Sequence, residues 1–525
     1  MAVKKQRNHR MLGYAVLIAG SLALGSCGSK DDSDETTETS STTDGTDDVS
    51  SVNALATAYP GDLALSVFPD SETSLRLQDD AASQDAAIDK PYEEKIEEAE
   101  NRLKGEGDCF DPSLMGEHKS ETQVTCYDFD ADMNPTTSSS NGNTYTVGTE
   151  DGTDGNGQAC MVTFAKAEVS SIVFKVDKTL AMVQGLLCSA KKAAVAAGSE
   201  LVLPTVGDEA GLDMLTAVNS EMPSGRGITM SAAVMSAFEN SDGSTGYMTE
   251  MTFTNSEGST DVISLRHVPP TTEGGDESGV LTFMRSPNGT DNGDQNQQWN
   301  KYDVMSINYI RTTATDGTEQ MQAELRSAMI NKSYEPIDSD GLVAYGNVPD
   351  AAQNSDIHAI KYVSFDLNPA NGAGTLSYWM NPGGNITEAA RGFLFNIAAD
   401  DSGVLSGCGV SGAAWGVSIR ASLADSTGAT VLEPTKFWHP LPGTNTHANP
   451  DTRYVDEDGN SGNLITKQCF SQNASGVYAI DTAETTHARG YDVLVGTAAG
   501  VEPPSRPEMP PPPPAGTGPT KPPAS

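Results

Sequence analysis

The aspartates at positions 128, 130 and 132 have the residue type and spacing of metal ligands. In Asp128-Phe-Asp130-Ala-Asp132 a carboxylate recurs at every second residue. Ca²⁺ prefers several hard oxygen ligands at about 2.4 Å, and carboxylates two residues apart can converge on one ion. The Gly and distal Glu of an EF-hand are missing, because Met133 and Ser139 stand at those offsets. The alternation is compatible with a calcium site, and a solvated acidic loop is the simpler interpretation.

Two histidines offer a second potential metal site. His439 and His447 flank a segment with Pro and Gly, and Asp451 and Asp456 follow them. A His/Asp group of this kind suits a transition metal, although the HExxH and HxH spacings are missing. These residues support the alternative of a metal-dependent hydrolase. Elsewhere the sequence contains no GxSxG motif and no P-loop lysine. We interpret the glycine-rich stretch Gly403–Gly412 as a turn-rich loop.

Cys27 stands directly after an N-terminal segment of the secretory type. Four basic residues precede the uncharged run Met11–Ser26, whose 16 residues are followed at once by the cysteine. A basic start followed by a short apolar run is typical of a signal peptide. The run is short for a spanning helix, which needs about 20 residues. We therefore interpret residues 1–26 as a signal peptide and expect an exported protein.

The junction also resembles the lipobox of bacterial lipoproteins, in which a small-residue pair precedes the acylated cysteine. Leu24-Gly25-Ser26-Cys27 carries the resemblance, which is limited to residues 1–32. It implies cleavage before Cys27, acylation (palmitate) of that residue and attachment to a membrane; an ordinary cleaved signal or an uncleaved anchor is the alternative. Gly28 replaces the Asp that retains many lipoproteins in the inner membrane, which indicates the outer membrane. Lys30-Asp31-Asp32 resembles surface-export signals, so the periplasmic and surface faces stay open.

The other six cysteines predict disulfides, since an even number in an exported chain favours pairing. Cys160 and Cys188 lie 28 positions apart on one expected helix, hence about 42 Å apart. A disulfide tolerates about 7 Å between Cα atoms, so these two must pair elsewhere. We favour three bonds: Cys109–Cys188, Cys126–Cys160 and Cys408–Cys469. The other pairing of the first four cysteines, Cys109–Cys160 with Cys126–Cys188, stays open. A tetracysteine metal site lacks the usual close Cys-x-x-Cys pair.

Composition limits the class of partner. The net charge of −40 becomes −44 once residues 1–26, with four basic and no acidic residues, are removed. A polyanion such as nucleic acid normally requires a basic face, so we exclude it as a partner. Residues 27–60 are predicted to form an acidic disordered tether, and residues 500–525 a Pro-rich disordered tail.

The elements between these ends fall into a helical part and a strand part. Residues 84–221 are predicted to be a helical segment that contains a long amphipathic helix over 158–197, with apolar residues at steps of three or four. Residues 226–496 alternate apolar and polar residues between turns such as Asn240–Thr245, which predicts antiparallel strands. A split near 346–356 would make two β domains. The expected class is α+β: a helical, disulfide-stapled N-terminal segment with an antiparallel β sandwich, curved sheet or partly open barrel.

These observations favour a non-catalytic envelope lipoprotein that binds or presents an unidentified protein or apolar ligand. A metal-dependent hydrolase tethered at the envelope is one alternative, and a calcium-dependent adhesive surface protein is another. No cofactor is expected beyond the calcium considered at Asp128, Asp130 and Asp132. Envelope lipid carriers are a further analogy, which requires an apolar cavity between helix and sheet.

Overall fold

A single large sheet dominates the computed structural model. The structure describes positions 55, 58–61, 63, 65 and 68, residues 92–110, the pairs 139–140 and 143–144, and, with short gaps, residues 158–345, 356–415 and 464–489. All of these belong to one compact unit, Asp48–Ser525. Thirteen strands form one antiparallel sheet in which each pairs with its neighbours in the sequence. The α+β class and the antiparallel pairing are therefore confirmed.

The strands are long in the middle of the sheet and short at one edge. They are β3 (Glu209–Gly211), β4 (Thr229–Glu239), β5 (Thr245–Thr254), β6 (Thr260–Val268), β7 (Glu277–Arg285), β8 (Lys301–Thr313), β9 (Glu319–Asn331), β10 (Ile357–Leu367), β11 (Gly374–Asn381), β12 (Ala389–Ala399), β13 (Leu405–Trp415), β14 (Leu464–Gln472) and β15 (Tyr478–Arg489). The two-residue strands β1 (Ser139–Ser140) and β2 (Asn143–Thr144) pair separately. Because β9 pairs with β10, the strands on either side of residues 346–356 belong to the same sheet.

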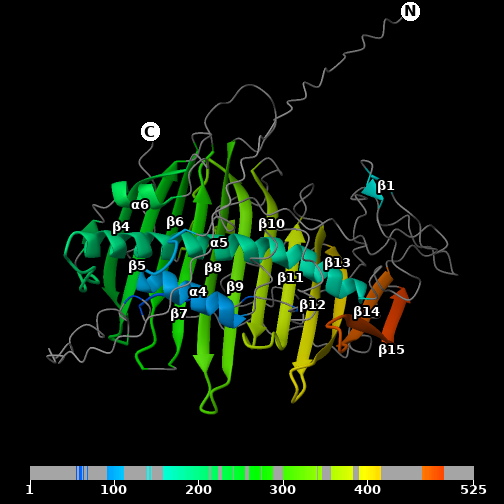
Figure 1. Ribbon diagram of the computed structural model, residues 1–525. Helices are drawn as coiled ribbons and strands as arrows, with labels where there is room; N and C mark the ends of the chain where they lie inside the picture. Colours follow the sequence, from blue (N-terminus) through cyan, green and yellow to red (C-terminus); the bar gives the residue numbers. More distant parts are fainter. Residues whose placement is uncertain are drawn as a thin grey trace, which may run out of the picture. The chain divides into compact units, whose positions relative to one another are not determined.

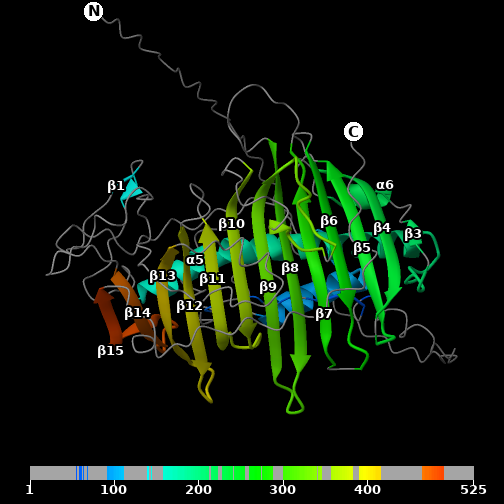
Figure 2. The same ribbon diagram turned by 180° about the vertical axis from the view of Figure 1, so that it is seen from behind.

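Helix α5 (Cys160–Ala196) crosses the strands on one face of the sheet, with α4 (Tyr92–Lys104) beside it (Figure 1). The strands lie in front of both helices in the reverse view (Figure 2), and a short helix, α6 (Leu215–Glu221), lies near β4. The 37 residues of α5 extend about 55 Å. Thirteen strands about 4.8 Å apart are about 58 Å wide. The helix is thus long enough to cover nearly the whole width of the sheet.

The apolar core lies between α5 and the sheet, on what we call the helix-covered face. One row of paired side chains on this face crosses seven strands: Leu265, Leu281, Ile307, Leu325, Val363, Tyr378 and Phe393. These residues and buried residues of α5, such as Val176 and Leu187, form one continuous cluster. Alternation along each strand puts these side chains on one face, as the period of two predicts.

The fold begins earlier in the chain than expected. Leu55, Ala58 and Tyr59 lie within the range 27–60 predicted to be tether, yet all three are buried in the core. Leu63, Leu65 and Phe68 are buried with them. We call residues 55–68 the N-terminal segment. The tether prediction was wrong for Leu55, Ala58 and Tyr59, because a few spaced apolar side chains suffice to dock this part of the chain on the core.

Other corrections concern elements with weak local signals. Strand β3 lies within the predicted helical range 84–221, where its three residues pair with β4. The segment Gly403–Gly412 was expected to be a loop, but it enters strand β13 at Leu405. The glycine at 407 fits this strand because an added Cβ would meet the backbone of β12 at Asn396.

The opposite face of the sheet carries buried polar side chains under a crossing segment of chain. Residues 336–345, between β9 and β10, run over this face. The Thr282 hydroxyl donates to the Gly341 carbonyl at 2.7 Å, and the Val343 amide donates to Ser306 Oγ at 2.9 Å. Backbone that crosses a sheet face cannot join its ladder, so hydroxyls supply the partners that buried amide groups require. This explains why small hydroxyl residues, Thr282 and Ser306, stand at central positions of β7 and β8.

The β4 side of the sheet is capped by a side chain. The Asn219 amide of α6 donates to the Met230 carbonyl at 3.0 Å, and its oxygen accepts from the Met230 amide at 2.8 Å. This pair of bonds imitates the ladder of a neighbouring strand. At the other edge, β15 pairs irregularly with β14 between Lys467 and Cys469, which leaves extra residues in β15. Irregular and capped edges oppose strand addition by other chains.

Candidate functional site

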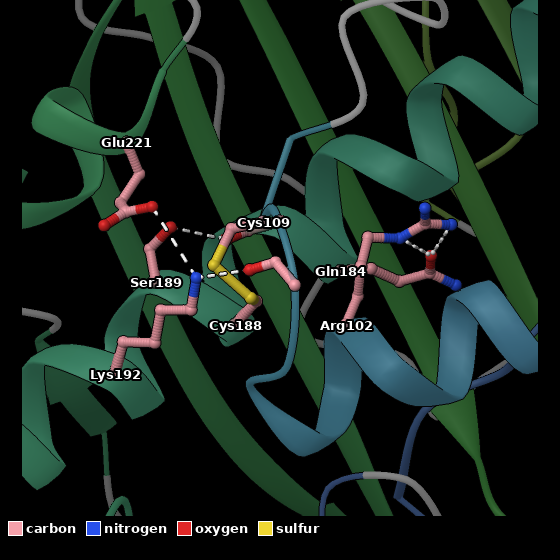
Figure 3. The surroundings of a disulfide bond; sticks show 9 residues. Arg102, Cys109, Gln184, Cys188, Ser189, Lys192 and Glu221 are labelled. Carbon is pink, nitrogen blue, oxygen red and sulfur yellow. Dashed lines mark hydrogen bonds and ion pairs between the residues drawn. A yellow bond between two sulfur atoms is a disulfide. The ribbon is translucent and has the colours of Figure 1, made fainter. Parts of the chain in front are cut away.

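A disulfide fastens the elements that cover α5. Cys109 bonds to Cys188, 79 positions later in the sequence, with their Cα atoms 5.4 Å apart, and both residues are buried (Figure 3). Near this bond, Lys192 Nζ donates to the Gly107 carbonyl and lies 3.8 Å from a carboxylate oxygen of Glu221. The bond joins the chain after α4 to the C-terminal half of α5, so α4 is held beside the long helix.

A buried amide connects three parts of the cover. Gln184 of α5 accepts from Arg102 of α4 at 3.0 and 3.1 Å (Figure 3). Its NH₂ group donates to the carbonyls of Pro60 and Gly61 in the N-terminal segment, at 3.0 and 2.5 Å. Both ends of the amide are therefore satisfied, as burial requires. Gln184 connects the N-terminal segment and α4 to one point on α5.

Gly185 lets the covering chain approach α5 closely. An added Cβ would collide with the ring of Phe110 and would lie 2.7 Å from the Cys109 carbonyl oxygen. A glycine in a helix interior costs about 1 kcal/mol relative to alanine, so its presence here requires a packing reason. The contact with residues 109 and 110 supplies that reason, and α5 continues without a break through this position.

The N-terminal segment contacts the sheet at two places. Thr249 of β5 donates to the hydroxyl of Tyr59 at 3.1 Å, and the Tyr59 and Tyr247 rings are 5.9 Å apart. Phe68 meets a group of aromatic rings edge-on, with centroids 5.0–5.4 Å away: Phe395, Phe470 and Tyr478. A φ of 54° puts Phe68 in the left-handed region, which costs a non-glycine residue about 1–2 kcal/mol. Aromatic packing at the β12–β15 end offsets this strain.

Polar groups at the helix–sheet boundary are also used in holding the two together. Lys175 of α5 donates to both carboxylate oxygens of Asp303 on β8, at 2.8 and 3.0 Å. The Tyr378 hydroxyl on β11 donates to Glu168 of α5 at 2.6 Å, and Lys361 Nζ lies 3.7 Å from the same carboxylate. Burial raises the pKa of Tyr378 well above its ordinary value, and the neighbouring Glu168 carboxylate adds to that rise. The hydroxyl therefore stays protonated and donates.

A missing side chain allows a contact across a strand. His267 on β6 and Tyr309 on β8 both pair with Gly279, which lies between them on β7. The two side chains meet over the glycine, with His267 Nδ1 2.8 Å from the Tyr309 hydroxyl. A Cβ at position 279 would lie 2.6 Å from that hydroxyl and 2.5 Å from the Arg266 carbonyl oxygen. Both side chains are fully buried.

Glu277 and Arg311 complete what we call the polar cluster, with His267 and Tyr309. Arg311 Nη1 lies 3.0 Å from Glu277, whose other oxygen is 3.7 Å from His267 Nε2. Burial, and then the charge of Arg311, lower the pKa of His267 to about 3. The imidazole is neutral at neutral pH, so the 3.7 Å separation is not an ion pair. With Nδ1 accepting from Tyr309, the proton is assigned to Nε2 and directed at Glu277.

Burial also shifts the pKa values of Glu277 and Tyr309 in this cluster. It raises the pKa of Glu277, against the lowering effect of Arg311, and raises the pKa of Tyr309 well above its ordinary value. A general base or acid needs a pKa near the working pH and access to substrate. His267 and Tyr309 have neither, so the arrangement is suited to holding β6, β7 and β8 together.

The structure brings together four of the predicted site residues. Cys109 bonds to Cys188, and Cys408 of β13 to Cys469 of β14, which are two of the three favoured pairings. Cys160 begins α5, and its side chain is not among those described. The remaining predicted positions lie outside the described residues: Cys27, Cys126, Asp128, Asp130, Asp132, His439 and His447. Within the described residues, no group of three His, Cys, Asp or Glu side chains could hold a metal ion.

Sequence reasoning missed the polar cluster. His267 stands isolated in the sequence, and its contacts depend on the register of β6, β7 and β8. The one available signal was Gly279, a glycine at the start of a strand pattern, which often marks a close approach of other groups. Without the register, that signal does not indicate which side chains approach.

Comparison with known proteins gives no relative from which a function could be transferred: no family model, no curated protein and no solved structure matches this chain. In the described part of the chain, no helix combines the length and apolarity needed to cross a membrane.

Proposed function

We propose that the chain is a bacterial envelope lipoprotein, anchored in the outer membrane through acylated Cys27, whose folded part is a non-catalytic scaffold that binds or presents another molecule. The two disulfides carry the part of this proposal that concerns compartment. Bonds such as Cys109–Cys188 form and persist in oxidising compartments outside the cytosol. They agree with the signal peptide and lipobox inferred from residues 1–27.

Three features support a scaffold. The helix-covered face is packed directly against α5 as one continuous apolar cluster. Polar groups at that boundary, including Gln184 and Lys175, are used in contacts that join segments distant in the sequence. His267 and Tyr309 of the polar cluster have pKa values shifted away from neutrality. Chemistry and lipid carriage would require accessible groups or a cavity, so we favour a binding or presenting role.

Metabolic labelling with palmitate tests the anchor. We expect the full-length protein to incorporate label and to fractionate with the outer membrane. Cys27→Ser should abolish labelling and release the protein into the soluble fraction. Gly28→Asp is the matched control, because it should keep the label but shift the protein to the inner membrane. A Cys27→Ser variant that stays in the membrane fraction would refute the anchor.

Partner capture tests the scaffold. The full chain, carrying a photo-crosslinker at an exposed position of the α4 surface such as Glu97, is crosslinked in cells of its own source. The scaffold role predicts one or a few reproducible crosslinked species that Cys27→Ser depletes. Turnover of small ester, peptide or glycoside substrates that is lost in a His439→Ala, His447→Ala double variant would instead support the hydrolase alternative.

A further inference from the structure

The polar cluster adjoins the place where the N-terminal segment docks. Tyr247 of β5 pairs directly with His267 of β6, and both side chains belong to one row on the helix-covered face. Tyr59 of the N-terminal segment packs on Tyr247 and accepts a hydrogen bond from Thr249. Tyr247 is therefore both the cross-strand neighbour of His267 and a contact of the docked segment. Directly opposed cross-strand residues have Cβ atoms about 5 Å apart, so a change at His267 is transmitted to Tyr247.

The N-terminal segment also differs from the rest of the cover in how it is held. The chain after α4 is fixed to α5 by the Cys109–Cys188 bond. Residues 55–68 precede that bond, and their described contacts are apolar packing and hydrogen bonds to Gln184 and Thr249. The strained φ of Phe68 opposes docking at the other end. The segment can therefore leave without breaking a covalent bond.

We propose that the polar cluster is an acid-sensitive latch that holds the N-terminal segment on the sheet. Protonation of His267 puts a second positive charge beside Arg311 in a buried site and removes Nδ1 as the acceptor for Tyr309. The buried cation is stabilised by opening to water, and opening displaces Tyr247 and with it Tyr59. The proposal concerns the folded domain alone and does not depend on the lipid anchor.

The groups around the imidazole determine the direction of the response. His267 faces Tyr309 and Arg311 from β8, Glu277 from β7 and Tyr247 from β5, with Glu319 of β9 acting on Glu277. Because the pKa of His267 falls from 6.5 to about 3 on folding, the closed state is fully favoured above pH 6.5. That advantage is lost as pH falls from 6.5 towards 3, about tenfold in the opening equilibrium per pH unit.

Glu277 acts in the opposite sense. Burial raises its pKa, so acid relieves the cost of burying its charge, and the Arg311 ion pair already offsets part of that cost. The tyrosines do not titrate in acid. We expect the His267 effect to dominate, with opening of the segment increased about 100-fold at pH 4.5 relative to pH 7.5.

Hydrogen exchange followed by mass spectrometry, corrected for the intrinsic rate at each pH, measures the opening. In the full mature chain, we expect the peptide that covers residues 55–68 to lose protection by about 100-fold between pH 7.5 and 4.5. A peptide of the sheet centre, such as β12, should keep its protection over the same range. Equal loss in both peptides would mean global unfolding and would overturn the latch.

Two variants assign the effect to the imidazole. His267→Gln, which stays uncharged and can still accept from Tyr309, should abolish the pH dependence of the N-terminal peptide. His358→Gln, on β10 four strands away, is the matched control and should retain it. Thr249→Val should raise opening at every pH by the same factor. If His267→Gln responds to acid as the wild type does, His267 is not the sensor.

A direct titration covers the case in which His267→Gln fails to fold. Deuterium exchange at the imidazole C2 position reports the titration of individual histidines in the wild-type chain. The latch requires that His267 does not titrate between pH 5 and 8 while the segment is docked. A normal midpoint near 6.5 would overturn the proposal regardless of the variants.

Discussion

Replacement of Gly279 by alanine tests whether the contact between His267 and Tyr309 depends on the missing side chain. The new Cβ would lie 2.6 Å from the Tyr309 hydroxyl, well inside van der Waals contact. Tyr309 must move, which breaks its buried hydrogen bond with His267. Leaving buried polar groups unpaired costs about 1–3 kcal/mol, and overpacking costs about 1–3 kcal/mol more. We expect the free energy of unfolding to fall by about 4 kcal/mol.

Denaturant unfolding, followed by circular dichroism and tryptophan fluorescence, measures this loss in a double-mutant cycle. In a Tyr309→Phe background the hydrogen bond is already gone, so Gly279→Ala should cost at least 1 kcal/mol less than in the wild type. Gly407→Ala is the matched control, because its Cβ would meet only the backbone of β12. Its cost should be the same in both backgrounds. A loss below about 1 kcal/mol for Gly279→Ala, or additivity with Tyr309→Phe, would refute the reasoning.

Changes at three further places probe the cover of α5. Gly185→Ala should destabilise the fold by about 2 kcal/mol in a denaturant titration, because the collision with Phe110 outweighs the gain in helix propensity. An unchanged midpoint would contradict the close approach of Phe110 to α5. In the Cys109→Ala, Cys188→Ala double variant the free energy of unfolding should fall by about 4 kcal/mol in the same assay, since the bond joins residues 79 positions apart. Retention of the wild-type melting temperature would count against a structural role for the bond. Phe68→Ala should cost about 3–5 kcal/mol, because its buried ring packs against three aromatic rings. Phe68→Gly should cost about 1 kcal/mol less than Phe68→Ala, because glycine adopts the left-handed φ without strain; a larger cost for glycine than for alanine would contradict the strain.

Periodicity and turn chemistry predicted the elements that are specified locally. The long helix follows from apolar residues repeated at steps of three and four, and α5 spans Cys160–Ala196 inside the predicted range 158–197. The hairpin between β4 and β5 turns at Asn240–Ser244, where an Asp-Gly pair lies in the predicted turn. Helix length alone separated Cys160 from Cys188, which reduced the number of disulfide pairings. In each case the decisive interactions lie within a short stretch of chain.

Features that depend on strand register could not be predicted in this way. That thirteen strands form one sheet depends on pairing across residues 346–356, where no local signal indicates continuity. The polar cluster depends on the alignment of three strands, and the hydroxyls of Thr282 and Ser306 depend on a segment that crosses above them. Docking of Leu55–Phe68 depends on core residues far along the chain. Such contacts are specified by the fold as a whole and not by any window of sequence.

The position of the N-terminal segment has a mechanical consequence for a chain anchored at Cys27. Any pull on the anchor enters the fold at Leu55 and reaches residues 55–68 before it reaches the crosslink at Cys109. Withdrawal of the segment together with α4 would free the 54 residues from Leu55 to Asp108, or up to about 190 Å of chain. The disulfide then stops further extension, because Cys188 belongs to the helix that covers the sheet. The domain would yield first in a segment that can dock again, while the sheet itself carries no load.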